Sequence, residues 1–186
     1  SDALFAELIQ QAHARGMRVI LDGVFNHCGA FHKWLDREGL YKGKLRGAYR
    51  YADSPYHDYF YWNADGTYEG WWGYENHPKL NVEGCAALRE ELLAIARRWV
   101  SPPFDADGWR LDVANEINHD FWRHFRAAVR AVKKDALLIG EIWEDAQCWL
   151  LGDQFDSTMN YRFSYLCTDF FAKRTMCARE FDEQMT

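Results

Sequence analysis

The sequence has no apolar run that approaches the ~20 residues of a membrane-spanning helix, and it has no tract of basic residues. It also has no internal repeat and no low-complexity segment. Its five cysteines are irregularly spaced and include no CxxC pair, so they do not form the pattern of a disulfide framework. We therefore expect no membrane span, no nucleic acid as the main partner, and a reducing, cytoplasmic location.

The composition is that of a folded, acidic protein. Apolar residues make up 48% and charged residues 27% of the 186 positions, which excludes disordered and fibrous classes. The formal net charge is −6, from 22 basic and 28 acidic residues. The length suits one domain but is shorter than the ~250 residues of a typical eightfold α/β barrel.

Helical periodicity alternates along the chain with short apolar runs. Apolar runs of this length without polar alternation are typical of strands buried on both faces. Alternating helices and buried strands predict a parallel α/β sheet or barrel. The helices are expected at 2–15, 88–99 and 121–132, and the strands at 17–21, 106–113, 136–139 and, more weakly, 157–161.

The exception is the segment 28–80, which has no sustained periodicity and is rich in glycine, tyrosine, tryptophan and aspartate. An insert of this length is expected to be functional or to form a small subdomain. Residues 31–75 hold 14 of the aromatic side chains. These rings either build a local core or offer flat faces for stacking sugar rings. The pair Trp71–Trp72, flanked by glycines, is the one we expect to be exposed.

Three carboxylic acids each follow an apolar strand-like run. Asp22 follows MRVIL, Asp112 follows GWRL, and Glu141 follows ALLIG. The carboxyl ends of parallel strands carry the active sites of α/β folds. Any one of these acids could instead be a helix cap or turn residue, but all three together favour a site.

Arg110 and Asp112 are two residues apart, so both side chains leave the same face of the strand. The adjacent cation is expected to keep Asp112 ionised, as a nucleophile requires. Glu141, close to that negative charge, is expected to have a raised pKa and to act as the acid. Two carboxyl groups about 5–5.5 Å apart are the requirement for retaining glycoside hydrolysis. The alternative for Arg110 and Asp112 is a structural ion pair.

His27 closes the loop after the first strand, and it is either a packed ring or a donor to a substrate hydroxyl. A metal site would draw on Asp22, His27, His32 and His57, but their spacing matches no compact zinc signature. No DxDxDG loop is present, although oxygen ligands in the insert leave a structural calcium ion open. The two-carboxylate chemistry requires no metal or other cofactor.

Five motifs in order resemble the α-amylase family of glycoside hydrolases. DGVFNH, GWRLDVANE and GEIW are similar to three conserved regions of that family. HPKLN and GDQFDSTMNYRF resemble stretches of its neopullulanase, cyclomaltodextrinase and maltogenic amylase subgroup. The aromatic insert lies where the family has its small B domain. His77 stands where the subgroup usually has methionine and Arg162 where proline is common, which leaves the fine specificity open.

The resemblance implies a role for each matching residue. Asp112 is implied as the nucleophile and Glu141 as the general acid/base. Arg110 is implied to orient Asp112, with Asp22 bracing Arg110 and His27 binding the sugar at the point of cleavage. The remaining implied substrate contacts are Asn115 and Glu116 on the acceptor side, together with Trp143 and Trp72.

The resemblance also implies a partial (β/α)8 barrel, about strands three to six, with the B domain inserted. The implied parts are a barrel portion at 1–27, the insert at 28–83 and a second barrel portion at 84–186. The family's fourth region, which supplies a third essential carboxylate, has no counterpart in this sequence. The chain is therefore expected to be a central piece of a longer enzyme and to be inactive alone.

The implied function is hydrolysis of α-glucosidic bonds in cyclodextrins, pullulan, starch or maltooligosaccharides, with an α-glucan oligosaccharide as the partner and a homodimeric parent protein. Two alternatives stay open. One is a non-catalytic carbohydrate-binding or interaction protein on the same barrel. The other is a transglycosylase or isomerase of the family, such as trehalose synthase, because pocket shape decides between water and sugar as the acceptor.

Overall fold

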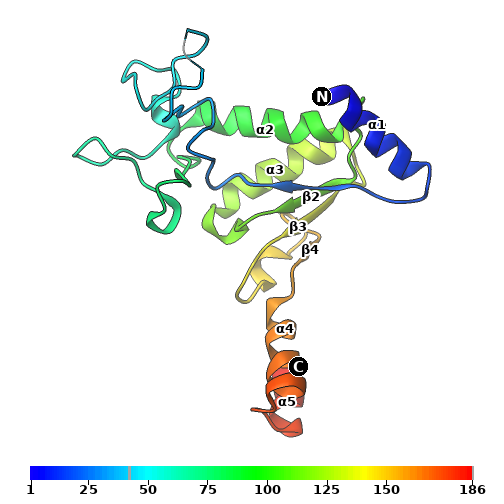
Figure 1. The fold of residues 1–186 in the computed structure, drawn as a ribbon. Helices are drawn as coiled ribbons and strands as arrows, with labels where there is room; N and C mark the ends of the chain where they lie inside the picture. Colours follow the sequence, from blue (N-terminus) through cyan, green and yellow to red (C-terminus); the bar gives the residue numbers. More distant parts are fainter. Residues whose placement is uncertain (42, 186) are drawn as a thin grey trace.

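A computed structural model describes residues 1–41 and 43–185. Four strands form one sheet in which every neighbouring pair is parallel, and their order in the sheet is their order in the chain (Figure 1). This one-directional parallel order is that of a barrel wall, so the predicted α/β class and partial barrel are confirmed. The strands are β1 (Ile20–Gly23), β2 (Gly108–Leu111), β3 (Leu137–Gly140) and β4 (Ser157–Thr158).

Two helices, α2 (Ala86–Val100) and α3 (His119–Val132), lie side by side against the sheet. α1 (Asp2–His13) lies near the end of α2 and the start of the strands (Figure 1). Asn118 caps α3 by accepting a hydrogen bond from the backbone N–H of Phe121 at 2.9 Å. The apolar faces of α2 and α3 are buried, with Leu88 and Phe125 fully covered. The helices therefore form at the positions in the chain that the periodicity predicts.

The strand bounds differ from the sequence prediction. β2 covers only 108–111 of the expected 106–113, and β3 is shifted by one residue, to 137–140. The first strand begins three residues later than expected, at Ile20, and Met17 is exposed. It is also not buried on both faces, because Leu21 is half-buried and Asp22 is exposed. The fourth strand ends at Thr158 rather than at position 161, because Asn160 caps a new helix by accepting from the N–H of Phe163.

Among its described residues, 28–41 and 43–83, the insert that follows β1 forms only short 3₁₀ turns, at His57–Tyr59 and Trp71–Gly73, and isolated antiparallel bridges. Backbone hydrogen bonds join its end to the loop after β1: Leu80 N–H donates to Asn26 and Cys28 N–H donates to Pro78. Several of its aromatic rings form a local core, which is the first of the two roles expected for them from the sequence. The buried rings of this core are Trp34, Tyr59 and Phe60.

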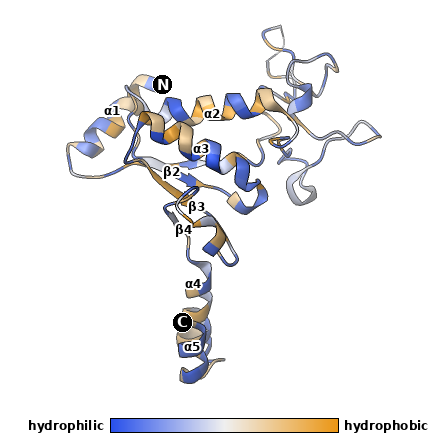
Figure 2. Cartoon of the chain, turned by 180° about the vertical axis from the view of Figure 1, so that it is seen from behind, coloured by the Kyte–Doolittle hydropathy of each residue, from blue (hydrophilic) through white to orange (hydrophobic). Residues whose placement is uncertain are grey.

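The end of the chain forms an arm that projects away from the sheet (Figures 1 and 2). It consists of α4 (Tyr161–Cys167), a π-helical segment (Thr168–Lys173) and α5 (Ala178–Met185). Hydrophobic and hydrophilic residues alternate along it (Figure 2). Within the described residues, no helix has the length and apolar character needed to cross a membrane.

Candidate active site

One arginine holds three carboxylates at the carboxyl edge of the sheet. Nη1 of Arg110 lies 2.8 Å from Oδ1 of Asp22 and 2.7 Å from Oδ1 of Asp112. Nη2 of the same guanidinium lies 2.9 Å from Oε1 of Glu141. The three acids predicted to meet at this edge are therefore brought together around one cation.

Strand register explains this arrangement. Asp22 on β1 pairs with Arg110 on β2, so their side chains leave neighbouring strands on the same face. Asp112 and Glu141 each follow the last residue of a strand, and the sheet ladder continues through them. The N–H of Asp112 donates to Gly23 at 3.0 Å, and the N–H of Glu141 donates to Leu111 at 2.9 Å.

The electrostatic balance holds Arg110 as a cation. Burial acts to lower its pKa, but hydrogen bonds to Asp22 and Asp112 and the charges of Glu141 and Asp22 raise the pKa well above its ordinary value. A guanidinium with two terminal nitrogens satisfies several carboxylates at once, which a lysine ammonium does with less directional control. Arg110 thus orients both candidate catalytic acids.

Val113 links these two acids through a strained backbone. Its φ of 38° is left-handed, an outlier for a β-branched residue. In this conformation its N–H donates to Oε2 of Glu141 at 2.9 Å, and the next N–H, of Ala114, donates to the Glu141 carbonyl at 3.1 Å. The backbone directly after Asp112 therefore fixes Glu141, a contact that nothing in the sequence pattern signals.

The expected raised pKa of Glu141 is wrong. Burial does raise the pKa of this carboxyl, but the N–H of Val113, the hydroxyl of Tyr161 and the indole of Trp143 donate to it. Together with the positive charge of Arg110, these donors place the pKa of Glu141 below its usual value. The charge that acts on this carboxyl is the positive one of Arg110, which contacts both acids, and not the negative charge of Asp112.

Tyr161 is a site residue without an assigned role in the sequence analysis. Its hydroxyl donates to Oε1 of Glu141 at 2.8 Å, and this bond is the main cause of the raised pKa of Tyr161. The side chain reaches the site because β4 ends at Thr158 and α4 begins at Tyr161. The only signal in the sequence is that Tyr161 lies within the fifth motif.

His27 is nearly covered by an indole ring. Trp71 stacks on it with ring centroids 4.9 Å apart and planes 7° apart, and only 7% of His27 is exposed. Desolvation by burial lowers the pKa of His27, and His77 adds to the lowering, although the charge of Asp112 opposes it. The imidazole is therefore held neutral at neutral pH, with a nitrogen able to donate to a sugar hydroxyl.

Two other tryptophans form an aromatic wall beside the acids. Trp72 stacks on Trp71 at 5.2 Å and meets Trp143 edge to face at 5.5 Å. Trp72 is 66% exposed, as expected, whereas Trp71 is half-buried. The exposed Trp72 face suits stacking of a sugar ring.

The acceptor-side candidates lie on the turn after Asp112. Oδ1 of Asn115 is buried and has no hydrogen-bond partner among the described residues. Oε2 of Glu116 lies 4.0 Å from Nζ of Lys79, which also lies 3.7 Å from Glu69 of the insert. Like Tyr161, Lys79 has no role assigned from the sequence, although it lies within the HPKLN motif.

Within residues 1–41 and 43–185, no three His, Cys, Asp or Glu side chains are placed to hold a metal ion. The zinc set considered from the sequence is accordingly not assembled there.

Comparison with known proteins places the whole chain in one family. The model of the α-amylase catalytic domain matches residues 1–186. An amylopullulanase of Thermoanaerobacter thermohydrosulfuricus is 43% identical over 191 residues, which cover 92% of this chain and 13% of that protein. A cyclomaltodextrinase of Thermoanaerobacter pseudethanolicus is 41% identical over 194 residues, covering 97% of this chain and 31% of that enzyme.

Solved structures agree with these relatives. The cyclic α-maltosyl-(1→6)-maltose hydrolase of Arthrobacter globiformis superposes with a TM-score of 0.83 at 34% identity, over 97% of this chain and 40% of that one. The chain thus spans less than a third of the curated relatives named above. The family match over every residue, with the acids at the barrel edge, shows that this chain belongs to the α-amylase catalytic domain family of glycoside hydrolases.

Proposed function

We propose that this chain carries the catalytic acids of a retaining glycoside hydrolase that cleaves α-glucosidic bonds in cyclodextrins, pullulan, starch or maltooligosaccharides. The observation that carries the proposal is the single guanidinium of Arg110 between Asp112 and Glu141. It sets one carboxyl nucleophile and one proton-exchanging acid on the same edge, as retention requires. The names of the relatives, cyclomaltodextrinase and amylopullulanase among them, support the α-glucan class.

The reaction proceeds in two displacements. In the first, a carboxylate oxygen of Asp112 bonds to the anomeric carbon while the glycosidic C–O bond breaks and Glu141 gives its proton to the departing oxygen. In the second, Glu141 takes a proton from water as the water oxygen bonds to the same carbon and Asp112 is released. Arg110 keeps its positive charge throughout and holds both carboxyl groups in place.

The surrounding side chains have binding roles in this proposal. His27 donates to a hydroxyl of the sugar that is cleaved, and Trp72 stacks on a neighbouring sugar beside Trp143. Asn115 and Glu116 line the acceptor side, where the buried Oδ1 of Asn115 is an acceptor without a hydrogen bond among the described residues.

We propose that these 186 residues are a central part of the catalytic domain of a larger protein. The share of each relative that the chain covers supports this. The third carboxylate implied by the family then comes from elsewhere in that protein. A reducing, cytoplasmic location is proposed too, supported by five unpaired thiols, and mass analysis of the alkylated protein from cells checks it.

Hydrolysis of β-cyclodextrin and pullulan by the whole protein tests the function. Asp112→Asn and Glu141→Gln should each lower kcat by at least about 10² to 10³, because each removes a group that acts in the transition state. Glu144→Gln is the matched control, since Glu144 is exposed and makes no contact with Arg110. Activity should persist in EDTA, because the proposed chemistry uses no metal.

Three results would contradict the proposal. Full turnover in Asp112→Asn would show that the chemistry lies elsewhere. Sugar binding with no turnover in the unmodified protein would indicate a carbohydrate-binding protein instead. Products that are only transferred or isomerised sugars, without net release of reducing ends, would indicate the transglycosylase or isomerase alternative.

A further inference from the structure

The guanidinium of Arg110 has a fourth contact, which the proposed mechanism does not use. Its Nε donates to Sδ of Met159 at 3.5 Å, while its two terminal nitrogens face the three carboxylates. A thioether sulfur is only a weak hydrogen-bond acceptor. The residue that orients both candidate catalytic acids is therefore in direct contact with a sulfur atom that holds it weakly.

The sheet fixes the backbone of Met159 at the catalytic edge. Met159 follows β4 directly, and its N–H donates to the carbonyl of Gly140 at 3.2 Å, which continues the ladder between β3 and β4. Two residues later, the hydroxyl of Tyr161 donates to Glu141. Met159 thus stands at the same edge as the acids, beside the side chains that set their chemistry.

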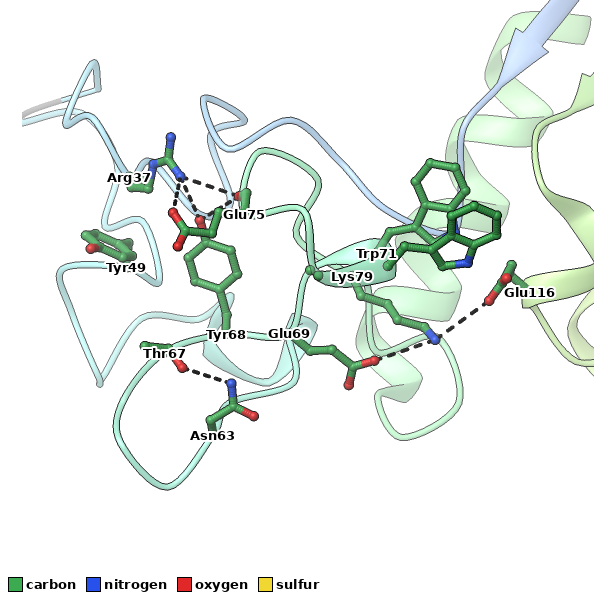
Figure 3. A pocket seen from close by; sticks show the side chains of 13 residues that line it. Arg37, Tyr49, Asn63, Thr67, Tyr68, Glu69, Trp71, Glu75, Lys79 and Glu116 are labelled. Atoms are coloured by element: carbon green, nitrogen blue, oxygen red, sulfur yellow. Dashed lines mark hydrogen bonds and ion pairs between the residues drawn. The ribbon is translucent and has the colours of Figure 1, made fainter.

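The side chain of Met159 is open to small solutes. It is 39% exposed, and its chain neighbours Thr158 and Asn160 line a pocket of about 380 Å³. A second pocket, of about 670 Å³, lies over the insert and reaches Glu116 on the turn after Asp112 (Figure 3). Both are many times larger than the roughly 30 Å³ that a water molecule occupies in the liquid. An edge that admits water and glucan in the proposed reaction also admits hydrogen peroxide, which is little larger than water.

We propose that Met159 is an oxidation site through which peroxide reversibly inactivates the catalytic edge. The sulfur lone pair attacks one oxygen of hydrogen peroxide, the O–O bond breaks and an S–O bond forms. The proton on the transferred oxygen passes to the departing hydroxide, which leaves as water. The sulfur is oxidised by two electrons to the sulfoxide and the peroxide is reduced. The inference rests on the proposed function, because the effect reaches the acids through Arg110.

The added oxygen changes the surroundings of Arg110 in two ways. A sulfoxide is polar and its oxygen is a strong acceptor, so it competes with the carboxylates for the guanidinium. It also needs space. Hydrogen bonds from N–H to oxygen are about 2.7–3.2 Å long, and the sulfur already lies 3.5 Å from Nε, so no oxygen fits between the two atoms unless one of them moves. Because the backbone of Met159 is held by Gly140, we expect the guanidinium to shift and its contacts with Asp112 and Glu141 to lengthen.

Peroxide treatment of the whole protein tests the inference, with hydrolysis of β-cyclodextrin and the oxidation of each methionine, from peptide masses, measured on the same samples. Turnover should fall in step with oxidation of Met159, by up to about 10²-fold, the effect of misplacing catalytic groups by about 1 Å. Methionine sulfoxide reductases A and B, which together return both sulfoxide epimers to the thioether, should restore it.

Two leucine variants identify the methionine responsible. Met159→Leu should keep its own untreated turnover after the same peroxide treatment. Met17→Leu is the matched control, because Met17 is 52% exposed but lies before β1, at the opposite end of the strand from Asp22. It should lose turnover as the unmodified protein does. The cysteines are the same in all of these proteins, so inactivation through a thiol would appear in Met159→Leu as well.

A third variant reproduces the oxidised state without an oxidant. Met159→Gln places an amide oxygen, a strong acceptor, near Nε of Arg110. Without peroxide, its kcat should be lower than that of Met159→Leu.

The inference is overturned if Met159→Leu is inactivated as fast as the unmodified protein, or if complete oxidation of Met159 leaves turnover unchanged. If Met159→Leu does not fold, the course of oxidation and reductase recovery in the unmodified protein decides. Failure of the proposed function is a separate outcome. If Asp112→Asn abolishes turnover but oxidation of Met159 does not lower it, only the oxidation site falls. If Asp112→Asn retains full turnover, the proposed function falls, and the inference that rests on it falls too.

Discussion

Arg110 determines how the two candidate catalytic acids behave. Its guanidinium contacts Asp22, Asp112 and Glu141, so a change in any one carboxyl alters the field at the other two. Glu141 receives further donors from Val113 and Tyr161, which favour its charged form. The charged form of Glu141 suits the step in which it acts as a base, whereas the step in which it acts as an acid requires its protonated form. The strength of these hydrogen bonds therefore influences how the rate of the proposed reaction depends on pH.

Tyr161→Phe should move the alkaline limb of kcat/KM to higher pH. The hydroxyl of Tyr161 stabilises the Glu141 carboxylate and so lowers its pKa, and removing it raises that pKa and keeps the acid protonated to higher pH. Tyr165→Phe, one turn along α4, should leave the profile unchanged. A pH–rate profile of the whole protein measures both, and an unmoved or lowered limb in Tyr161→Phe would contradict the assignment.

At the scale of elements, Asp107 joins three of them at the opposite end of the sheet. Its Oδ2 accepts from the backbone of Val19 at 2.7 Å and lies 2.7 Å from Nε2 of His13 on α1. Its Oδ1 lies 3.5 Å from Nζ of Lys133, just after α3. Burial raises the pKa of Asp107, but these partners outweigh it, so the pKa lies below its ordinary value.

Asp107→Asn should lower the stability of the whole protein by roughly 1.5–3 kcal/mol at neutral pH, because it removes charge-assisted hydrogen bonds. A carboxyl whose pKa is depressed by folding stabilises above its unfolded pKa and loses that contribution as the pH falls through the folded pKa. The difference should therefore shrink below about pH 4. Thermal unfolding across pH measures it, with the more exposed Asp105→Asn as the control, and a difference independent of pH would exclude the ionic role.

At the scale of the molecule, the sheet is open. Within the described residues, β1 and β4 each pair with a strand on one side only. Large apolar side chains are exposed on α1 and on the arm. They include Leu4 at 67%, Leu8 at 56%, Phe163 at 47% and Phe171 at 66%. Unpaired strand edges and exposed apolar faces favour association of chains.

The purified 186-residue chain should therefore be marginally stable, should associate as its concentration rises, and should not hydrolyse β-cyclodextrin. Light scattering over a dilution series and a reducing-end assay with Asp112→Asn as the blank measure the two properties. A concentration-independent monomer would show that the open edges are tolerated. Turnover equal to that of an intact relative would show that no further carboxylate is needed.

The linear pattern of residues determines the elements and the family of this protein. Periodicity located α2, α3 and three strands, because the order of apolar residues along the chain directly reflects burial of one helix face or of a short strand. The acids after the strands could be assigned to one edge, because parallel strands all end there. The residues that surround each acid could not be assigned from the sequence, because they are distant from it in the chain.

Only the tertiary structure decided that Arg110 also contacts Glu141, that Tyr161 donates to Glu141 and that Lys79 joins the insert to Glu116. It also reversed the expected pKa shift of Glu141. The physical reason is that a pKa reports the sum of all charges and donors within a few ångströms. For Glu141 these come from β2, from the ends of β2 and β3, and from the start of α4. Because these groups are far apart in the sequence, no local sequence pattern reveals that they meet.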